Sequence, residues 1–129
     1  MKKKILIVNA NYYKKISGGL ISSALKLIEG QYSIKIIDVP GVFEIPVTIS
    51  KNLKKFDAFI ALGCVIKGQT PHFDFISQAS TTAIMTLSIE SRKPIGNGII
   101  TCLNMKQAKE RKKKGAEAAK AIISILNQR

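Results

Sequence analysis

Residues 59–74 read FIALGCVIKGQTPHFD and hold the pattern that decides the fold. The run through Val65 is apolar and rich in strand-forming side chains, which predicts a buried β-strand. A glycine-containing loop follows, and Thr70 with Pro71 is typical of a helix N-cap and first helical residue. The stretch therefore predicts a strand, a loop and a helix that begins beside His72.

The same alternation recurs on both sides of this stretch. Apolar runs at 5–8, 34–39 and 95–101 predict three further strands. Apolar residues at helical spacing predict the helices: Leu20, Ile21, Ala24, Leu25 and Ile28 after Ser17; Ile76, Ala79, Ala83 and Leu87 after Pro71; Ala119, Ile122, Ile123 and Leu126 near the C-terminus. A short helix is expected to begin near Asn104 and to be broken from the last one at Gly115.

Near-continuous hydrophobicity of the strands is typical of a parallel sheet covered on both faces. The fold class expected is α/β: a three-layer αβα sandwich with a four-stranded parallel sheet flanked by helices on both faces. At 129 residues, one domain spanning 1–129 is expected. In such folds the ligand crevice lies beyond the carboxyl ends of the strands, so functional residues are expected in the loops after each strand.

Composition excludes several classes of protein. The two cysteines, Cys64 and Cys102, lie far apart without metal-ligand spacing, so neither a zinc site nor a disulfide framework is expected. The apolar run after the N-terminal lysines is too short for a signal peptide, and no apolar run is long enough to cross a bilayer. A cytoplasmic protein without metal or membrane association is expected.

The formal net charge of +13 invites a nucleic-acid-binding alternative, since basic surfaces attract phosphate. The lysines are scattered, and no RNA-binding aromatic set or zinc finger accompanies them. A solvated lysine-rich surface is therefore the favoured interpretation, with nucleic-acid binding as the alternative.

Each loop after a strand offers a candidate with two interpretations. Tyr12 and Tyr13 follow the first strand, where they could stack on a flat heterocycle or simply pack. After the second strand, Gly41 is expected to permit an unusual turn, and Glu44 lies near a helix N-terminus, where it could bind ligand hydroxyls or complement the helix dipole. Arg111 and its lysine neighbours could bind phosphate or form a solvated face.

His72 is the only histidine in the chain. In the first turn of a helix the dipole disfavours the imidazolium form, so a neutral, proton-accepting imidazole is expected beside a loop suited to anions. A purely structural role for this histidine is the alternative.

Five blocks in order, N-A-N-Y-Y, V-P-G-V-F-E-I-P, A-L-G-C-V-I-K-G-Q-T-P-H-F-D-F, P-I-G-N-G-I-I-T and Q-A-x-E-R followed by K-G-A-E-A-A, resemble the lumazine synthases over nearly the whole chain. The resemblance implies a flavodoxin-like fold and a transferase of riboflavin biosynthesis. That activity condenses 5-amino-6-ribitylaminouracil with 3,4-dihydroxy-2-butanone 4-phosphate and releases phosphate and water. No cofactor or metal is implied.

The resemblance also implies roles for individual residues. His72 would shuttle protons. The pyrimidine and the ribityl chain would be held by Tyr12, Val42, Phe43, Glu44, Val65, Ile66 and Asn97, the last standing where many members place an aromatic ring. The phosphate would be bound by Gly68, Gln69, Thr70, Arg111 and Lys114, with Lys112 or Lys113 as alternatives to Lys114.

Arg111 and Lys114 would reach the site of a neighbouring chain, so a homo-oligomer with shared active sites is expected. Because the chain begins almost directly with the first strand, a pentamer is expected instead of an icosahedral shell. An archaeal-type riboflavin synthase and a flavin- or lumazine-binding module without turnover are the other candidates, and the intact Thr70-Pro71-His72 loop favours the lumazine synthase.

Overall fold

The structure is a computed structural model that describes residues 2–68 and 71–128. Its centre is a four-stranded parallel sheet in the order β2-β1-β3-β4. The strands are β1 (Lys4–Ala10), β2 (Ser33–Val39), β3 (Ala58–Ile66) and β4 (Ile95–Cys102). The predicted α/β class and parallel sheet are confirmed, and each strand is at most three residues longer than its apolar run.

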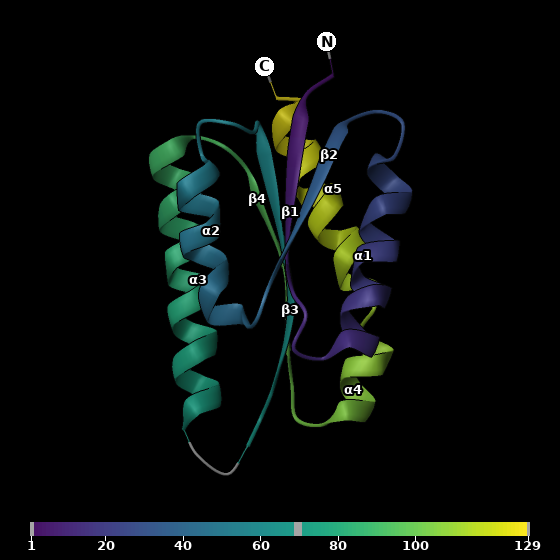
Figure 1. Cartoon of the computed structure of the whole chain (residues 1–129), viewed down its shortest axis with the longest axis vertical. Coiled ribbons are helices and arrows are strands. Elements are labelled where there is room, and N and C mark those ends of the chain that lie inside the picture. Colours follow the sequence, from purple (N-terminus) through teal and green to yellow (C-terminus); the bar gives the residue numbers. More distant parts are fainter. Residues whose placement is uncertain (1, 69–70, 129) are drawn as a thin grey trace.

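Helices cover the sheet on both faces, as Figure 1 shows, with α2 and α3 on one side and α1, α4 and α5 on the other. The helical segments are α1 (Lys14–Ile28), the 3-10 turn η1 (Val42–Glu44), α2 (Ile45–Asn52), α3 (His72–Ser91), α4 (Met105–Glu110) and α5 (Lys114–Leu126). The three-layer αβα arrangement is therefore confirmed.

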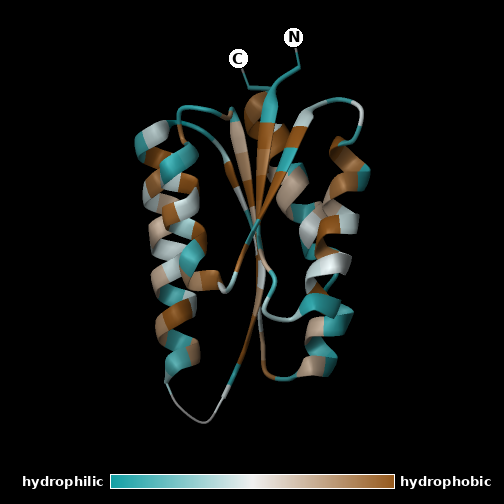
Figure 2. Cartoon of the chain, in the orientation of Figure 1, coloured by the Kyte–Doolittle hydropathy of each residue, from teal (hydrophilic) through white to brown (hydrophobic). Residues whose placement is uncertain are grey.

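The strands alternate their side chains between two apolar clusters, one under each helical layer. Ile5 and Ile7 point towards α1 and α5, while Leu6 and Val8 point towards α2 and α3. Figure 2 shows the resulting largely apolar strands between helices in which apolar and polar residues alternate. Burial on both faces explains the near-continuous hydrophobicity of β1 and β3.

Strand β2 departs from this expectation. It lies at the edge of the sheet, and Val39 is its only buried residue, whereas Ile36 is 41% exposed. The prediction of a buried strand at 34–39 was wrong because β-branched composition reports strand formation, and burial depends on the strand's place in the sheet.

Two helix boundaries also differ from the predictions. Helix α1 begins at Lys14, so Ser17 is buried inside it and its hydroxyl donates to the Lys14 carbonyl at 3.1 Å. Helix α3 begins at His72, one residue after the expected Pro71, and Thr70 lies outside the described residues. The start of α4 is confirmed, because the Asn104 side chain accepts a hydrogen bond from the Gln107 N–H.

The sequence suggested that Gly115 separates two helices. In the structure this glycine lies inside α5 and does not break it. A Cβ at this position would stand 2.1 Å from the Leu20 carbonyl oxygen and 2.5 Å from Ser23 Oγ. Ser23 Oγ itself donates to the Lys112 carbonyl at 2.7 Å and accepts from the Ala116 N–H at 3.1 Å. The absent side chain therefore allows α1 and α5 to meet through a shared hydrogen-bond network.

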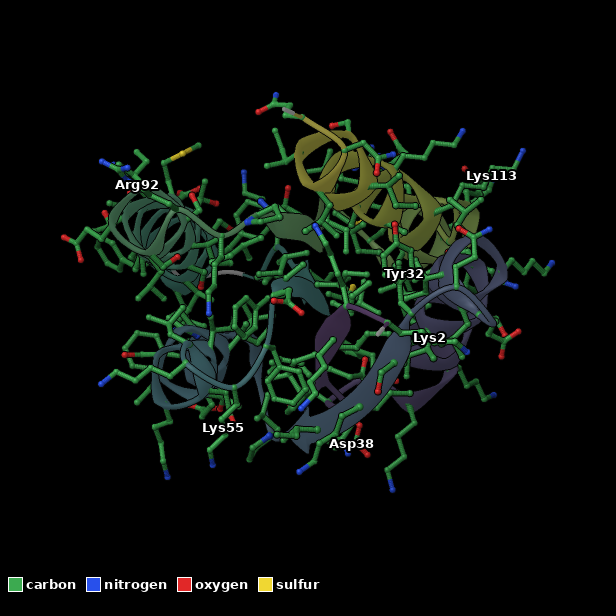
Figure 3. The ribbon with its side chains drawn as sticks, turned by 90° about the horizontal axis from the view of Figure 1, so that it is seen from above. Lys2, Tyr32, Asp38, Lys55, Arg92 and Lys113 are labelled. Carbon is green, nitrogen blue, oxygen red and sulfur yellow. The ribbon has the colours of Figure 1, made fainter. Side chains whose placement is uncertain are left out.

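The basic charge is distributed around the molecule. Figure 3, seen from above, shows Lys55, Arg92 and Lys113 projecting outward on different sides. Among the described residues no helix is long and apolar enough to cross a membrane.

Candidate functional site

A cavity of about 610 Å³ opens at the carboxyl ends of the strands, where the fold predicted a ligand crevice. Its lining residues come from the loop after β1, from η1, from the end of β3 and from the start of α3. They are Tyr12, Tyr13, Gly41, Val42, Phe43, Glu44, Cys64, Val65, Ile66, His72 and Ile76. Seven of the candidate site residues are thus brought to one cavity: Tyr12, Val42, Phe43, Glu44, Val65, Ile66 and His72.

The two tyrosines lie on the short connection between β1 and α1. The Tyr13 carbonyl accepts hydrogen bonds from the N–H groups of Ile16 and Ser17, both at 3.0 Å, which fixes its backbone at the start of α1. Tyr12 is 74% exposed, and its ring meets the Tyr13 ring edge-on, with centroids 4.9 Å apart and planes at 80°. An exposed aromatic face beside a cavity is suited to stacking on a flat heterocycle.

The turn η1 brings Glu44 to the cavity wall. The turn η1 packs closely against β3 because Gly63 has no side chain: a Cβ at Gly63 would stand 2.7 Å from Val42 Cγ2. The expected unusual turn at Gly41 was wrong, since its φ of −150° and ψ of 173° are extended backbone that any residue adopts. Glu44 immediately precedes α2, which confirms its predicted place at a helix N-terminus.

The end of β3 offers backbone groups to the cavity. Pairing of β1 with β3 ends at Asn9 and Leu62, whereas β3 continues to Ile66 along β4. In the described part of the chain, the β1-facing edge of residues 63–66 therefore has no strand partner. The backbone groups of alternate strand residues point to opposite edges, and the N–H groups of Phe59 and Lys67 donate to the Pro94 and Cys102 carbonyls on the β4 side. The peptide N–H and C=O of Ile66 therefore face the free edge and can bind the polar rim of a planar ligand, whereas those of Val65 face β4.

Cys64 lies on the same strand end and is nearly buried, with 8% exposed. Burial raises the pKa of its thiol to about 12, and neighbouring Cys102 adds to this effect. Both cysteines are free. At neutral pH the Cys64 wall of the cavity is thus a neutral, weakly nucleophilic thiol.

This environment predicts slow thiol chemistry. A disulfide reagent at pH 8 is expected to label Cys64 in a Cys102→Ala variant at least about 100-fold more slowly in the folded than in the urea-unfolded protein, because little thiolate is present when the pKa is raised. The measurement is the absorbance of the released thiol against time. Stoichiometric labelling of the folded protein at the unfolded rate would contradict the buried, protonated thiol.

His72 is the first residue of α3 and is exposed at the rim of the cavity. A twenty-residue helix begins at this point, so its free N–H groups favour an anion near the imidazole. Gly68 is exposed and does not line the cavity, whereas Gln69 and Thr70 lie outside the described residues.

The remaining candidates do not line the cavity of their own chain. Arg111 Nη1 donates to the Thr101 carbonyl at 3.0 Å, which holds the guanidinium at the carboxyl end of β4. Lys114 begins α5, next to this segment. Asn97 lies within β4, where its Oδ1 accepts a hydrogen bond from the Ile99 N–H at 3.0 Å. Arg111 and Lys114 thus lie at the same edge of the sheet as the cavity but outside it.

The site list from the sequence missed Cys64, Gly41 and Ile76 and left Tyr13 undecided. Only the strand pairing and the helix orientation bring these residues to the cavity, and the one local signal was that Tyr13 adjoins Tyr12. No group of three or more His, Cys, Asp or Glu side chains suited to a metal ion occurs within residues 2–68 and 71–128.

A parallel α/β sheet whose carboxyl edge carries an aromatic, carboxylate- and histidine-bearing cavity defines a protein that binds a small polar molecule. Comparison with known sequences gives the family. The profile described as 6,7-dimethyl-8-ribityllumazine synthase matches residues 2–129, and the chain belongs to this family.

Individual relatives agree with this assignment. The 6,7-dimethyl-8-ribityllumazine synthase of Bartonella tribocorum is 41% identical, over 98% of this chain and 91% of its own length. The enzymes of the same name from Cutibacterium acnes and Zymomonas mobilis are each 39% identical, over 95% and 96% of this chain and 80% and 94% of their own lengths. The family resemblance stated from the sequence is confirmed.

A comparison with solved structures also shows the fold. The ABC domain in complex with L-Trp from Streptococcus pneumonia matches with a TM-score of 0.51 and 14% sequence identity. The match covers 99% of this chain but only 41% of that chain, and at this identity it shows the fold alone.

Proposed function

We propose that the chain condenses 5-amino-6-ribitylaminouracil with 3,4-dihydroxy-2-butanone 4-phosphate to form 6,7-dimethyl-8-ribityllumazine, as a transferase of riboflavin biosynthesis. The family match over residues 2–129 carries the activity. The observation that supports its location is the single cavity that gathers Tyr12, Glu44 and His72.

The cavity accounts for binding of the pyrimidine substrate. The exposed Tyr12 ring stacks on the heterocycle, unpaired backbone groups of Ile66 bind its polar edge, and Val65 lines the cavity beside them. Glu44 accepts hydrogen bonds from the ribityl hydroxyls beside Val42 and Phe43. Holding two substrates together removes on the order of 7–11 kcal/mol of the barrier, which suits a reaction that proceeds without a cofactor.

The phosphate-bearing substrate is bound at the β3–α3 connection. Gly68, Gln69 and Thr70 supply the loop, and the N-terminus of α3 favours the anion. His72 takes and returns protons during imine formation, phosphate elimination and ring closure. In their own chain Arg111 and Lys114 lie outside the cavity, and the family resemblance assigns them to the phosphate site of a neighbouring subunit.

The surface of α3 is the observation that favours a cyclic oligomer, and we propose that this helix lies at the interface of a pentamer. Residues 75–89 contain no charged residue in a chain with 21 basic and 8 acidic ones. Phe75, Met85 and Ile89 on this helix are 66%, 58% and 67% exposed in the single chain. An uncharged helix face with large exposed apolar side chains is typical of a surface that a second copy covers.

The activity is tested by mixing the protein with both substrates and following lumazine absorbance and phosphate release together, against a blank without protein. Acceleration of both signals is expected. If neither exceeds the blank, lumazine alone is tested as substrate, and its dismutation would instead support a riboflavin synthase.

Shared sites predict complementation between two inactive variants. When His72→Ala and Arg111→Ala chains are unfolded, mixed in equal amounts and refolded, about one quarter of the sites are expected to regain both residues, because each intact site needs one chain of each kind in the correct order. The measurement is the lumazine-forming rate of the mixture relative to the wild type.

A matched mixture separates this result from non-specific recovery. His72→Ala mixed with Tyr12→Leu is expected to show no activity beyond that of the two variants measured separately, since both residues belong to the same chain's part of the site. Equal recovery in both mixtures, or none in either, would be evidence against Arg111 serving the neighbouring chain.

A further inference from the structure

Tyr13 lines the cavity but has no role in the function described above. Its ring is partly buried and packs against the apolar cluster under α1 and α5. Its carbonyl is fixed by the hydrogen bonds from Ile16 and Ser17, so both backbone and ring are anchored. Tyr12 has the opposite character, with 74% of its surface exposed.

The anchored ring contacts the exposed one. Tyr13 meets Tyr12 edge-on, at 4.9 Å between centroids and 80° between planes. Edge-to-face contact is a preferred geometry for aromatic pairs, because the positive ring edge faces the negative π-face. A tyrosine on a short loop with few other contacts can adopt several rotamers, and this contact selects one of them.

The chemistry of Tyr13 is compatible with a supporting role. Burial raises the pKa of its phenol, and nearby Cys64 and Tyr12 add to this effect, so the ring stays neutral beside the substrate. Tyr13 also lines a second cavity of about 300 Å³ between α1 and α4, so it forms the wall between the two spaces.

We propose that Tyr13 is a positioning residue that holds the Tyr12 ring, by edge-to-face contact, in the orientation in which Tyr12 stacks on the pyrimidine substrate. The inference rests on the proposed function and deepens it. Tyr13 acts through Tyr12, so its loss weakens binding of the pyrimidine and leaves recognition of the phosphate-bearing substrate unchanged.

The test is a double-mutant cycle on binding and kinetics. Tyr13→Leu is expected to raise KM for the ribitylaminouracil and Kd for the lumazine product about 3- to 10-fold, with KM for the butanone phosphate unchanged. Lumazine binding is measured by fluorescence titration. In a Tyr12→Leu background, adding Tyr13→Leu is expected to change neither constant further, because the ring that Tyr13 orients is gone.

Matched variants separate positioning from packing. Tyr13→Phe keeps the ring edge and is expected to restore KM and Kd to within about 2-fold of the wild-type values. Tyr32→Leu removes another partly buried tyrosine, which packs against the same cluster but directly precedes β2, at the amino end of the strand and away from the cavity at the carboxyl ends. It is expected to lower stability without changing KM. Leucine is preferred to alanine at position 13 because alanine would join the two cavities, and Tyr13→Met replaces it if the leucine variant fails to fold.

The outcomes are distinct. If the wild type reacts and binds lumazine but Tyr13→Leu has the same constants, or if its effect is equally large without Tyr12, the inference is wrong and the proposed function stands. If Tyr32→Leu raises KM by the same factor, Tyr13 acts only through packing and the inference is wrong. If the wild type neither reacts nor binds lumazine, the proposed function fails and the inference with it.

Discussion

His72→Ala is expected to lower kcat for lumazine formation by about 10²- to 10⁴-fold, the usual contribution of a positioned proton-transfer group. The imidazole lies at the rim of the cavity as the first residue of α3, within reach of a ligand bound there. The side chain is exposed, so the variant is expected to fold. If its unfolding temperature is close to that of the wild type, the loss of rate reports on chemistry and not on folding.

Steady-state kinetics of both substrates and a thermal unfolding curve check this result. KM values are expected to stay within about 3-fold, because the stacking and backbone contacts of the pyrimidine are untouched. Asp74→Asn, an exposed substitution in the same helical turn, serves as the control and is expected to leave the rate unchanged. If His72→Ala had nearly the wild-type kcat, His72 would not be the proton-transfer group, and catalysis would rest on the positioning of the two substrates.

Gly115→Ala is expected to destabilise the chain by at least about 2–3 kcal/mol, at the upper end of overpacking effects. The new methyl group would stand 2.1 Å from the Leu20 carbonyl oxygen and 2.5 Å from Ser23 Oγ. Backbone cannot rotate away from the clash as a flexible side chain can, so α1 and α5 must separate and the Ser23 hydrogen bonds to Lys112 and Ala116 must lengthen.

The measurement is the midpoint of thermal unfolding at a fixed protein concentration, where a loss of about 10 °C is expected for a chain of this size. Gly18→Ala is the matched control. Gly18 lies in α1 with nothing within 4 Å of its would-be Cβ, so alanine is expected to stabilise the helix by about 0.5–1 kcal/mol. Equal behaviour of the two variants would show that α1 and α5 tolerate a wider spacing.

The order of strands and helices could be predicted from sequence because each strand carries its own apolar run. The burial of β1 and β3 on both faces is encoded in their own apolar sequences. The edge position of β2 follows instead from the topology of the sheet, and the apolar Ile36 did not indicate in the sequence that it would be exposed. The role of Gly115 was equally hidden, since a glycine that terminates a helix and one that admits a neighbouring backbone look alike in sequence.

The candidate site was predictable where a residue follows its own strand, as Tyr12, Glu44 and His72 do. The sequence did not identify Cys64 and Ile76 as site residues, because strand pairing and helix orientation are what bring them to the cavity. Arg111 illustrates a further limit: the family resemblance implied a phosphate in a neighbouring subunit, and the single chain places Arg111 at the carboxyl edge of the sheet but outside the cavity. Its role stays a prediction, because one chain alone does not contain the neighbouring site.

The cavity is assembled from segments that follow three different strands, so no local part of the chain can form it. Ligand occupancy and global folding are therefore thermodynamically linked: any ligand that binds only the complete cavity stabilises the whole sheet, by about 2.7 kcal/mol at a concentration 100 times its Kd. In this architecture the binding of a substrate stabilises the folded chain. The enzyme is therefore most resistant to unfolding and proteolysis when its substrates are abundant.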